Sequence, residues 1–157
     1  MESEAQKGDN PLDLKAFLDA QIDIEKNWRG RGTDWFLQKL ASWANSMNIE
    51  FGITLNTPSG VVSGTMISHQ KYFSAFADNF TGAWAGQSKE KLRELIAGYG
   101  EPLPEEDESA DPFINYIHLK DAQIYAPGQN PLPSTGILWR GKISAVSGFN
   151  LGRLGSS

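Results

Sequence analysis

The spacing of hydrophobic residues changes several times along this 157-residue chain, and each change separates two expected elements. From Pro11 to residue 24, apolar side chains recur every three or four positions, which predicts an amphipathic helix. The polar residues 1–11 before it are expected to be disordered, and Arg29-Gly-Arg-Gly32 after it reads as a linker. The apolar positions of this first helix are Leu12, Leu14, Phe17, Leu18, Ile22 and Ile24.

A second helix is expected after the linker. Thr33 is a suitable N-cap, Asp34 in the first turn favours the helix dipole, and Asn48 is a plausible stop. The residues between them form one apolar stripe at helical spacing, which must be buried against another element. Its members are Phe36, Leu37, Leu40, Trp43, Ala44 and Met47.

The pattern then changes to strict alternation over residues 49–56, which predicts a half-buried strand. Thr57-Pro-Ser-Gly60 predicts a turn, and residues 61–68 predict the returning strand of a hairpin. Gly64 within that strand predicts a bulge or sharp bend.

A helical region follows the hairpin. Aromatic residues at helical spacing predict a helix with an aromatic face, and the glycines at 82 and 86 end it. Ser88 is expected to cap another helix that runs to Tyr99 and stops at Gly100. For helical aromatics such as Trp35, Trp43 and the Phe76/Phe80 pair, packing in the core is the favoured interpretation. The aromatic face is made by Tyr72, Phe73, Phe76 and Phe80.

The last third of the chain predicts two long strands, residues 115–125 and 137–152, joined by an irregular loop over 126–136. Residues 101–112 before them hold six acidic residues and three prolines, which predicts a solvated loop. The tail from Arg153 is expected to be frayed.

These elements predict an α+β fold with N-terminal helices, a strongly bent antiparallel sheet or small open barrel, and a helical insertion. Such an order is typical of Sm-like or SH3-like domains. The expected organisation is a disordered tail (1–11), an N-terminal helix and linker (12–32) and a single domain (33–154).

Composition narrows the class of protein. The net charge of −5 disfavours wholesale nucleic-acid binding. No cysteine is present, so disulfides and thiolate chemistry are ruled out, as in many cytosolic proteins. No signal peptide or span of about 20 apolar residues is visible, so we expect a cytoplasmic protein without a membrane partner.

Candidate chemistry is sparse. His118 lies within a strand and His69 within a turn, and neither belongs to a metal-binding spacing, so no metal site or cofactor is predicted. No nucleophile elbow or phosphate-binding glycine loop occurs. Asp121 is a lone carboxylate that is expected to pair with Lys120 or Arg140. The chain is therefore expected not to be an enzyme.

The clearest candidate for a functional surface is a basic and aromatic group on the last strand, formed by Trp139, Arg140 and Lys142. No acidic residue follows Asp121 in an otherwise acidic chain. Trp and Arg are favoured at binding hot spots, so this group is predicted to be an interaction surface. For Trp139 itself, interface and core remain equally open.

Several blocks of sequence resemble the gas vesicle accessory protein GvpU family over about residues 33–152. The blocks are Asp34-Trp-Phe-Leu, Gly52-Ile-Thr-Leu-Asn56, Val62-Ser-Gly-Thr-Met-Ile-Ser68, Lys71-Tyr-Phe, Phe76-Ala-Asp78, Tyr116-Ile-His-Leu-Lys-Asp-Ala122 and Leu138-Trp-Arg-Gly-Lys-Ile-Ser144. The resemblance implies a cytosolic, non-enzymatic protein that clusters gas vesicles, which are protein-shelled and gas-filled, through self-association and shell contact. It brings no catalytic residues.

Three hypotheses follow. The first is a self-associating accessory protein that binds a gas vesicle shell protein, with acidic segments meeting the basic group in a salt-sensitive assembly. The alternative is an Sm-like RNA-binding ring, which the acidic charge opposes. The third is a hydrolase or lyase, which would require His69 or His118 to be buried beside a carboxylate.

Overall fold

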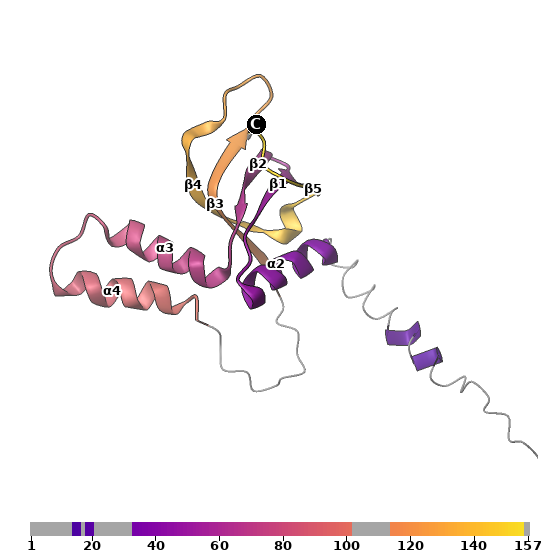
Figure 1. The fold of residues 1–157 in the computed structure, drawn as a ribbon, viewed down its shortest axis with the longest axis horizontal. Coiled ribbons are helices and arrows are strands. Elements are labelled where there is room, and N and C mark those ends of the chain that lie inside the picture. Colours follow the sequence, from indigo (N-terminus) through magenta and orange to yellow (C-terminus); the bar gives the residue numbers. More distant parts are fainter. Residues whose placement is uncertain (1–13, 17, 21–32, 102–113, 156–157) are drawn as a thin grey trace, which may run out of the picture.

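The computed structural model in Figure 1 describes residues 14–16, 18–20, 33–101 and 114–155. The expected tail 1–11, the linker 29–32 and nearly all of the acidic loop 101–112 lie outside these residues. Residues 14–16 and 18–20 are helical, as predicted. The other elements, in chain order, are α2 (Trp35–Met47), β1 (Phe51–Thr57), β2 (Gly60–Met66), α3 (His69–Thr81), α4 (Gln87–Gly98), β3 (Tyr116–Tyr125), β4 (Leu132–Lys142), the 3₁₀ turn η1 (Ile143–Ala145) and β5 (Gly148–Leu151).

The five strands form one antiparallel sheet with the order β4-β3-β2-β1-β5, so the predicted α+β class is confirmed. The β1–β2 hairpin pairs Thr57 with Gly60 across the expected turn. The prediction of one strand over 137–152 is wrong. β4 ends at Lys142, η1 turns the chain, and β5 then crosses the molecule to pair with β1. Within the described residues, the sheet is open at β4 and β5.

The sheet bends at an extra residue in β3. Its pairing shifts register near Asp121 on both the β2 and the β4 side, and Asp121 has a left-handed backbone with φ of 50°. Gly64 lies opposite this point, so the predicted bulge is confirmed, with the extra residue on the partner strand. On the other side the chains approach so closely that a Cβ on Gly136 would lie 2.4 Å from the Asp121 Cα atom.

Helix α2 covers one face of the sheet and closes the core. Its N-cap is Asp34 rather than Thr33, because the Asp34 carboxylate accepts from the amides of Phe36 and Leu37. Asn48 ends the helix in a left-handed conformation, as predicted. Burying a side chain such as Leu37 completely contributes about 1.5–3 kcal/mol. The buried core also contains Ala41, Ala44, Ile53, Leu55, Val62, Met66, Ile117, Leu119, Ala122, Ile143 and Val146.

Two different segments of the chain cover the opposite face of the sheet. Over β1 and β2 lies the C-terminal segment, where the Leu154 amide donates to the Ser63 hydroxyl at 2.8 Å and the Thr54 hydroxyl donates to the Gly152 carbonyl at 2.8 Å. The expected fraying from Arg153 is therefore wrong for residues 153 and 154. Over β3 and β4 lies the start of α3.

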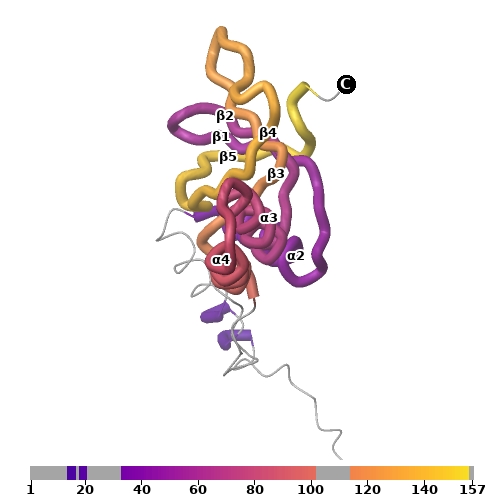
Figure 2. The backbone as a smooth tube through the Cα atoms, turned by 90° about the vertical axis from the view of Figure 1, so that its left-hand side faces the viewer, coloured from indigo at the N-terminus to yellow at the C-terminus, as the bar shows by residue number. Residues whose placement is uncertain are grey.

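Helices α3 and α4 form an antiparallel pair that projects from one end of the sheet (Figures 1 and 2). Ser68 caps α3 by accepting from the Lys71 amide. The expected cap at Ser88 is wrong, because α4 begins after Gly86, without a side-chain cap. None of the helices among the described residues is long and apolar enough to span a bilayer.

Candidate interaction surfaces

The predicted group Trp139, Arg140 and Lys142 does not form one continuous face. Neighbouring residues of β4 point to opposite faces of the sheet. Trp139 pairs with Leu119 and packs against the core, and its ring lies so close over Gly141 that a Cβ there would be 2.1 Å away. Arg140 and Lys142 lie on the other face. The proposal that this group binds a partner stays a prediction, and the geometry leaves only Arg140 and Lys142 to act together.

Arg140 of β4 contacts both the neighbouring strand β3 and helix α3. Its Nη1 donates to the His118 Nε2 at 2.8 Å, and its guanidinium lies 4.0 Å from the ring centroid of Tyr116 and 5.3 Å from that of Phe73. Such cation–π contacts add to the hydrogen bond. Arg140 is thus largely engaged within its own chain, and less of its charge is available to a partner than the sequence indicates.

His118 is buried beneath this arginine, with only 4% of its surface exposed. Burial, and then the charges of Arg140 and His69, lower its pKa to about 3. The imidazole is therefore neutral near pH 7. Because arginine can only donate, the His118 Nε2 must accept, and the ring proton resides on Nδ1. The same surroundings bury Tyr72, which raises the pKa of its phenol.

The fold brings both histidines together, which the sequence does not reveal. The rings of His69 and His118 are 5.4 Å apart, and the His69 Nε2 lies 2.8 Å from the carbonyl oxygen of Tyr99 at the end of α4. The buried partner of His118 is a cation, whereas an acid–base pair of the expected hydrolase type needs a carboxylate. Among the described residues, no group of three His, Cys, Asp or Glu side chains could hold a metal ion.

The expected pairing of Asp121 with Lys120 or Arg140 is wrong. Lys120 instead pairs with Glu50 at 2.5 Å, and Lys71 of α3 reaches the other oxygen of the same carboxylate at 2.7 Å. These two lysines lower the pKa of Glu50. Glu50 therefore links the start of α3 to β3 beside the arginine–histidine contact.

An aromatic ladder runs outward along α3. Its members, spaced four residues apart, have ring centroids 5.9–6.0 Å from one another, and the rings of Phe76 and Phe80 are nearly parallel at 12°. The first ring is buried, but the third and fourth are 48% and 49% exposed. The prediction that Phe76 and Phe80 lie in the core is wrong, because α3 extends beyond the sheet. The ladder consists of Tyr72, Phe76, Phe80 and Trp84.

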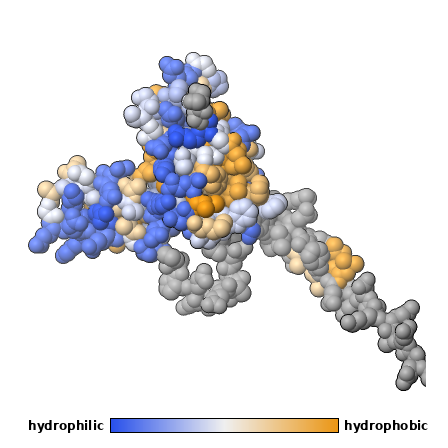
Figure 3. Space-filling model, viewed as in Figure 1, coloured by the Kyte–Doolittle hydropathy of each residue, from blue (hydrophilic) through white to orange (hydrophobic). Residues whose placement is uncertain are grey.

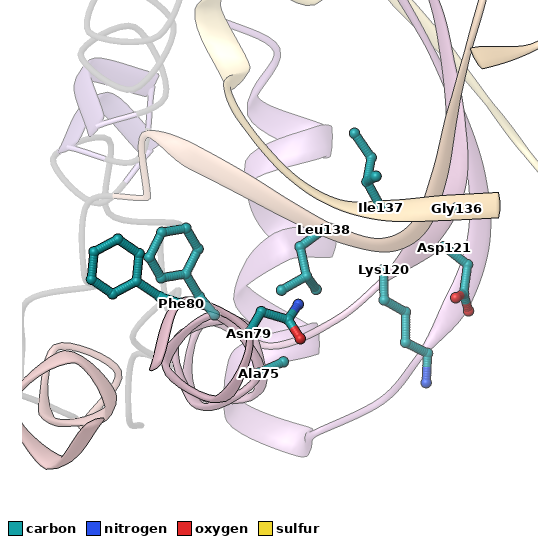
Figure 4. A pocket seen from close by; sticks show the side chains of 9 residues that line it. Ala75, Asn79, Phe80, Lys120, Asp121, Gly136, Ile137 and Leu138 are labelled. Carbon is teal, nitrogen blue, oxygen red and sulfur yellow. The ribbon is translucent and has the colours of Figure 1, made fainter. Parts of the chain in front are cut away.

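A groove of about 580 Å³ separates this ladder from the edge of the sheet. Figure 4 shows Asn79 and Phe80 on the α3 side and Leu138 on the β4 side. The bulge at Asp121 forms its floor together with Gly136. The ladder and the groove adjoin, and the described residues leave both uncovered; the groove itself is mixed, because Asn79, Lys120 and Asp121 line it together with apolar side chains.

A second apolar surface lies on the outer side of α2. Of the predicted stripe, the structure buries Leu37 and Ala44 but leaves Trp43 and Met47 41% and 56% exposed. Trp35 is also exposed, so placing Trp35 and Trp43 in the core was wrong. Phe36 is exposed as well, whereas Leu40, which lies between Phe36 and Trp43 on the same side, is only partly exposed and packs against the core. We call this set the α2 stripe: Phe36, Leu40, Trp43 and Met47.

The ladder and the α2 stripe could have been found from sequence only in part. Their helical spacing is visible, but the side of each helix that faces the sheet is not. Figure 3 shows hydrophobic side chains gathered over the sheet and α2 on this view, whereas the α3–α4 pair is mostly hydrophilic from this side.

Comparison with known proteins gives one finding. Residues 34–154 match the family described as Gas vesicle protein GvpU-like. No curated protein and no solved structure matches the chain. The expected likeness to Sm-like or SH3-like domains therefore stays a prediction, as does the single domain over 33–154.

Proposed function

The chain belongs to the GvpU-like family of gas vesicle proteins, and from this we propose that it is a non-enzymatic accessory protein of the cytoplasm that binds the vesicle shell and other copies of itself. The family match, which covers most of the chain, carries this proposal. By joining shell-bound copies, the protein would promote the clustering or assembly of vesicles.

Clustering requires each copy to make two kinds of contact, one with a shell and one with another copy. Two surfaces that the described residues leave uncovered could make these contacts, because the aromatic ladder and the α2 stripe lie on different helices. Aromatic side chains are favoured at the centre of protein interfaces. We assign the shell contact to the ladder, whose outer rings lie on the projecting α3–α4 pair.

The test is flotation, because gas-filled vesicles rise on centrifugation and carry bound protein with them. We expect the wild-type protein to float with purified vesicles. The variant Phe80→Lys/Trp84→Lys should stay in the lower fraction, and the matched variant Trp43→Gln/Met47→Lys on α2 should float. A wild-type protein that does not float would refute the proposed function. If both variants float, only the assignment to the ladder is refuted.

A further inference from the structure

The outer edge of β5 is an open strand edge. The sheet ends at β5, so no strand of the described residues pairs with the side of β5 that faces away from β1. On the inner side, the Gly152 amide donates to the Gly52 carbonyl at 2.8 Å, in the register of the β1–β5 pairs. Hydrogen-bonded pairs alternate along an antiparallel ladder. The backbone N–H and C=O groups of Phe149 and Leu151 therefore point outward, toward the place of a further strand.

Apolar side chains accompany these backbone groups. Phe149 and Leu151 lie opposite the buried Leu55 and Ile53, and thus on the core face of the sheet. Leu151 is 72% exposed, more than any other large hydrophobic residue in the part of the chain that the structure describes. The ring centroid of Phe149 lies 6.0 Å from that of Phe36 on α2. The core thus ends at β5 in side chains that a neighbouring strand would cover.

The exposed part of the α2 stripe lies on the same side of the core. With about 100° between successive residues, Phe36, Trp43 and Met47 lie within about 40° of one another around the helix. Because Phe36 contacts Phe149, this side of α2 is the one turned toward β5. We call the two parts together the β5 surface, which consists of Phe149, Leu151, Phe36, Trp43 and Met47.

The two free edges of the sheet differ in how well they are protected against pairing. Natural sheets protect such edges with proline, with charged side chains and with short strands. β4 carries Pro133, Arg140 and Lys142, and a second β4 beside it would bring these cations together. β5 is short, but Gly148–Leu151 contains neither a charge nor a proline. An identical strand can therefore pair with β5 without repulsion.

We propose that the β5 strands of two copies pair antiparallel about a two-fold axis that passes between their Asn150 residues. This inference rests on the proposed self-association and names the surface that performs it. The axis places Phe149 of each copy opposite Leu151 of the other. These are the residues whose backbone groups point outward, so each of the two pairs exchanges both of its hydrogen bonds. The exposed Leu151 of each copy is covered by a phenylalanine of the other.

The same axis brings the two α2 helices together. An axis perpendicular to the sheet keeps both cores on one face, so the two α2 stripes face each other across it. Such an interface is isologous and closes at two copies. Because α3 starts over β3 and β4, at the far edge of each sheet, the two aromatic ladders lie at opposite ends of the dimer. The dimer thus offers one shell contact at each end, as joining two vesicles requires.

A proline on each edge of the full-length protein tests which edge pairs. Leu151→Pro removes an outward amide that β1 does not use. The matched control is Lys142→Pro on β4. The amide of Lys142 also points outward, because the next amide, that of Ile143, donates to the Asn115 carbonyl in the β3–β4 register. Its φ of −74° suits proline. Circular dichroism confirms that each variant is folded.

Two substitutions of Asn150 test the axis itself. The side chain of Asn150 is exposed, so its replacement leaves the core unchanged. With Asn150→Asp or Asn150→Lys, a two-fold axis places two like charges directly opposite each other, which is unfavourable. An equimolar mixture of the two variants instead places opposite charges together. These variants decide alone if the proline variant does not fold.

The solution mass is measured by light scattering over a concentration series at low salt. Wild type and Lys142→Pro should reach twice the chain mass of 17.3 kDa, and Leu151→Pro should associate at least about tenfold more weakly. Asn150→Asp and Asn150→Lys should each associate about threefold more weakly, and their mixture should associate like wild type.

The helix part of the β5 surface is tested in the same series. Trp43→Gln/Met47→Lys should also weaken dimerisation at least about tenfold. The matched variant Ser42→Gln/Ser46→Lys places the same residues on the polar side of α2 and should dimerise like wild type. If both variants dimerise like wild type, the contact between the α2 stripes is refuted.

Three other results would overturn the inference. If Leu151→Pro associates like wild type, or if Lys142→Pro weakens association equally, another surface joins the copies, and the proposed self-association still stands. If the mixed Asn150 variants associate no more tightly than either variant alone, the two-fold axis is refuted. If wild type stays monomeric throughout the series, the self-association in the proposed function is refuted as well. Shell binding is tested separately, by flotation.

Discussion

Acid should destabilise this protein through one buried residue, His118. The unfolded chain protonates this histidine near pH 6.5, whereas the folded protein keeps it neutral down to a pKa of about 3. Between these values the unfolded state binds one more proton, so the free energy of unfolding falls as the pH falls. The contribution is fully present above pH 6.5 and is lost progressively below it.

The magnitude follows from the two pKa values. From about pH 7.5 to about pH 5.5, this histidine should reduce the free energy of unfolding by about 1.4 kcal/mol. The range stays above the sequence pI of about 5.0, where solubility would fall. It also stays above the titration of Glu50, whose pKa is lowered from 4.5.

The assay is urea unfolding, followed by tryptophan fluorescence, of wild type and His118→Gln at both pH values. Glutamine cannot titrate, but its side-chain oxygen can still accept from Arg140. The wild type should lose about 1.4 kcal/mol more than the variant over this range. Equal losses in the two proteins would refute the reasoning, because they would show that His118 is accessible to protons in the folded state.

Three further predictions concern the fold and the association. Arg140→Met should lower the free energy of unfolding, measured in urea, by about 2–3 kcal/mol, because the buried His118 nitrogen loses its hydrogen-bond donor. Arg140→Lys should lower it less. Equal effects of the two substitutions would contradict this prediction. Gly136→Ala should lower the free energy of unfolding by more than about 2 kcal/mol, because the added Cβ would meet the Asp121 backbone. The control Gly98→Ala in α4, where a Cβ meets nothing within 4 Å, should be neutral or stabilising in thermal melts. Similar shifts of the melting temperature in the two variants would argue against the close approach at Gly136. Association measured by light scattering should persist from low salt to roughly 0.5 M, because salt does not screen apolar contacts and because Arg140 is engaged by His118 and Tyr116. Dissociation at high salt would contradict this and would support a contact between the acidic segments and the basic group.

The strands show what sequence can establish in this chain. Alternation over residues 49–56 and the turn at 57–60 predict the β1–β2 hairpin because only one face of that strand is buried. The prediction of one strand over 137–152 is wrong because apolar residues recur from Ile137 to Leu151, so their spacing does not show where β4 ends and η1 begins. Nothing local indicates that β5 leaves β4 and pairs with β1, since that pairing depends on residues almost a hundred positions away.

The helices show a different limit. α2 carries two adjacent apolar stripes, and sequence cannot tell which of them faces the sheet. Hydrophobicity alone places large side chains such as Trp43 in the core, yet close packing buries Ala41 and Ala44 instead. The contact between Arg140 and His118 is invisible for a related reason, because the two residues are joined by strand register. Both surfaces assigned here consist of residues that hydrophobicity places in the core.

In the proposed function, shell-bound copies cluster vesicles by binding one another. The most direct measurement is the size of vesicle clusters, by light microscopy, when purified vesicles are mixed with wild type or with Trp43→Gln/Met47→Lys. We predict large clusters with wild type and dispersed vesicles with the variant, although the variant still floats with them. Clusters of equal size with both proteins would contradict the account.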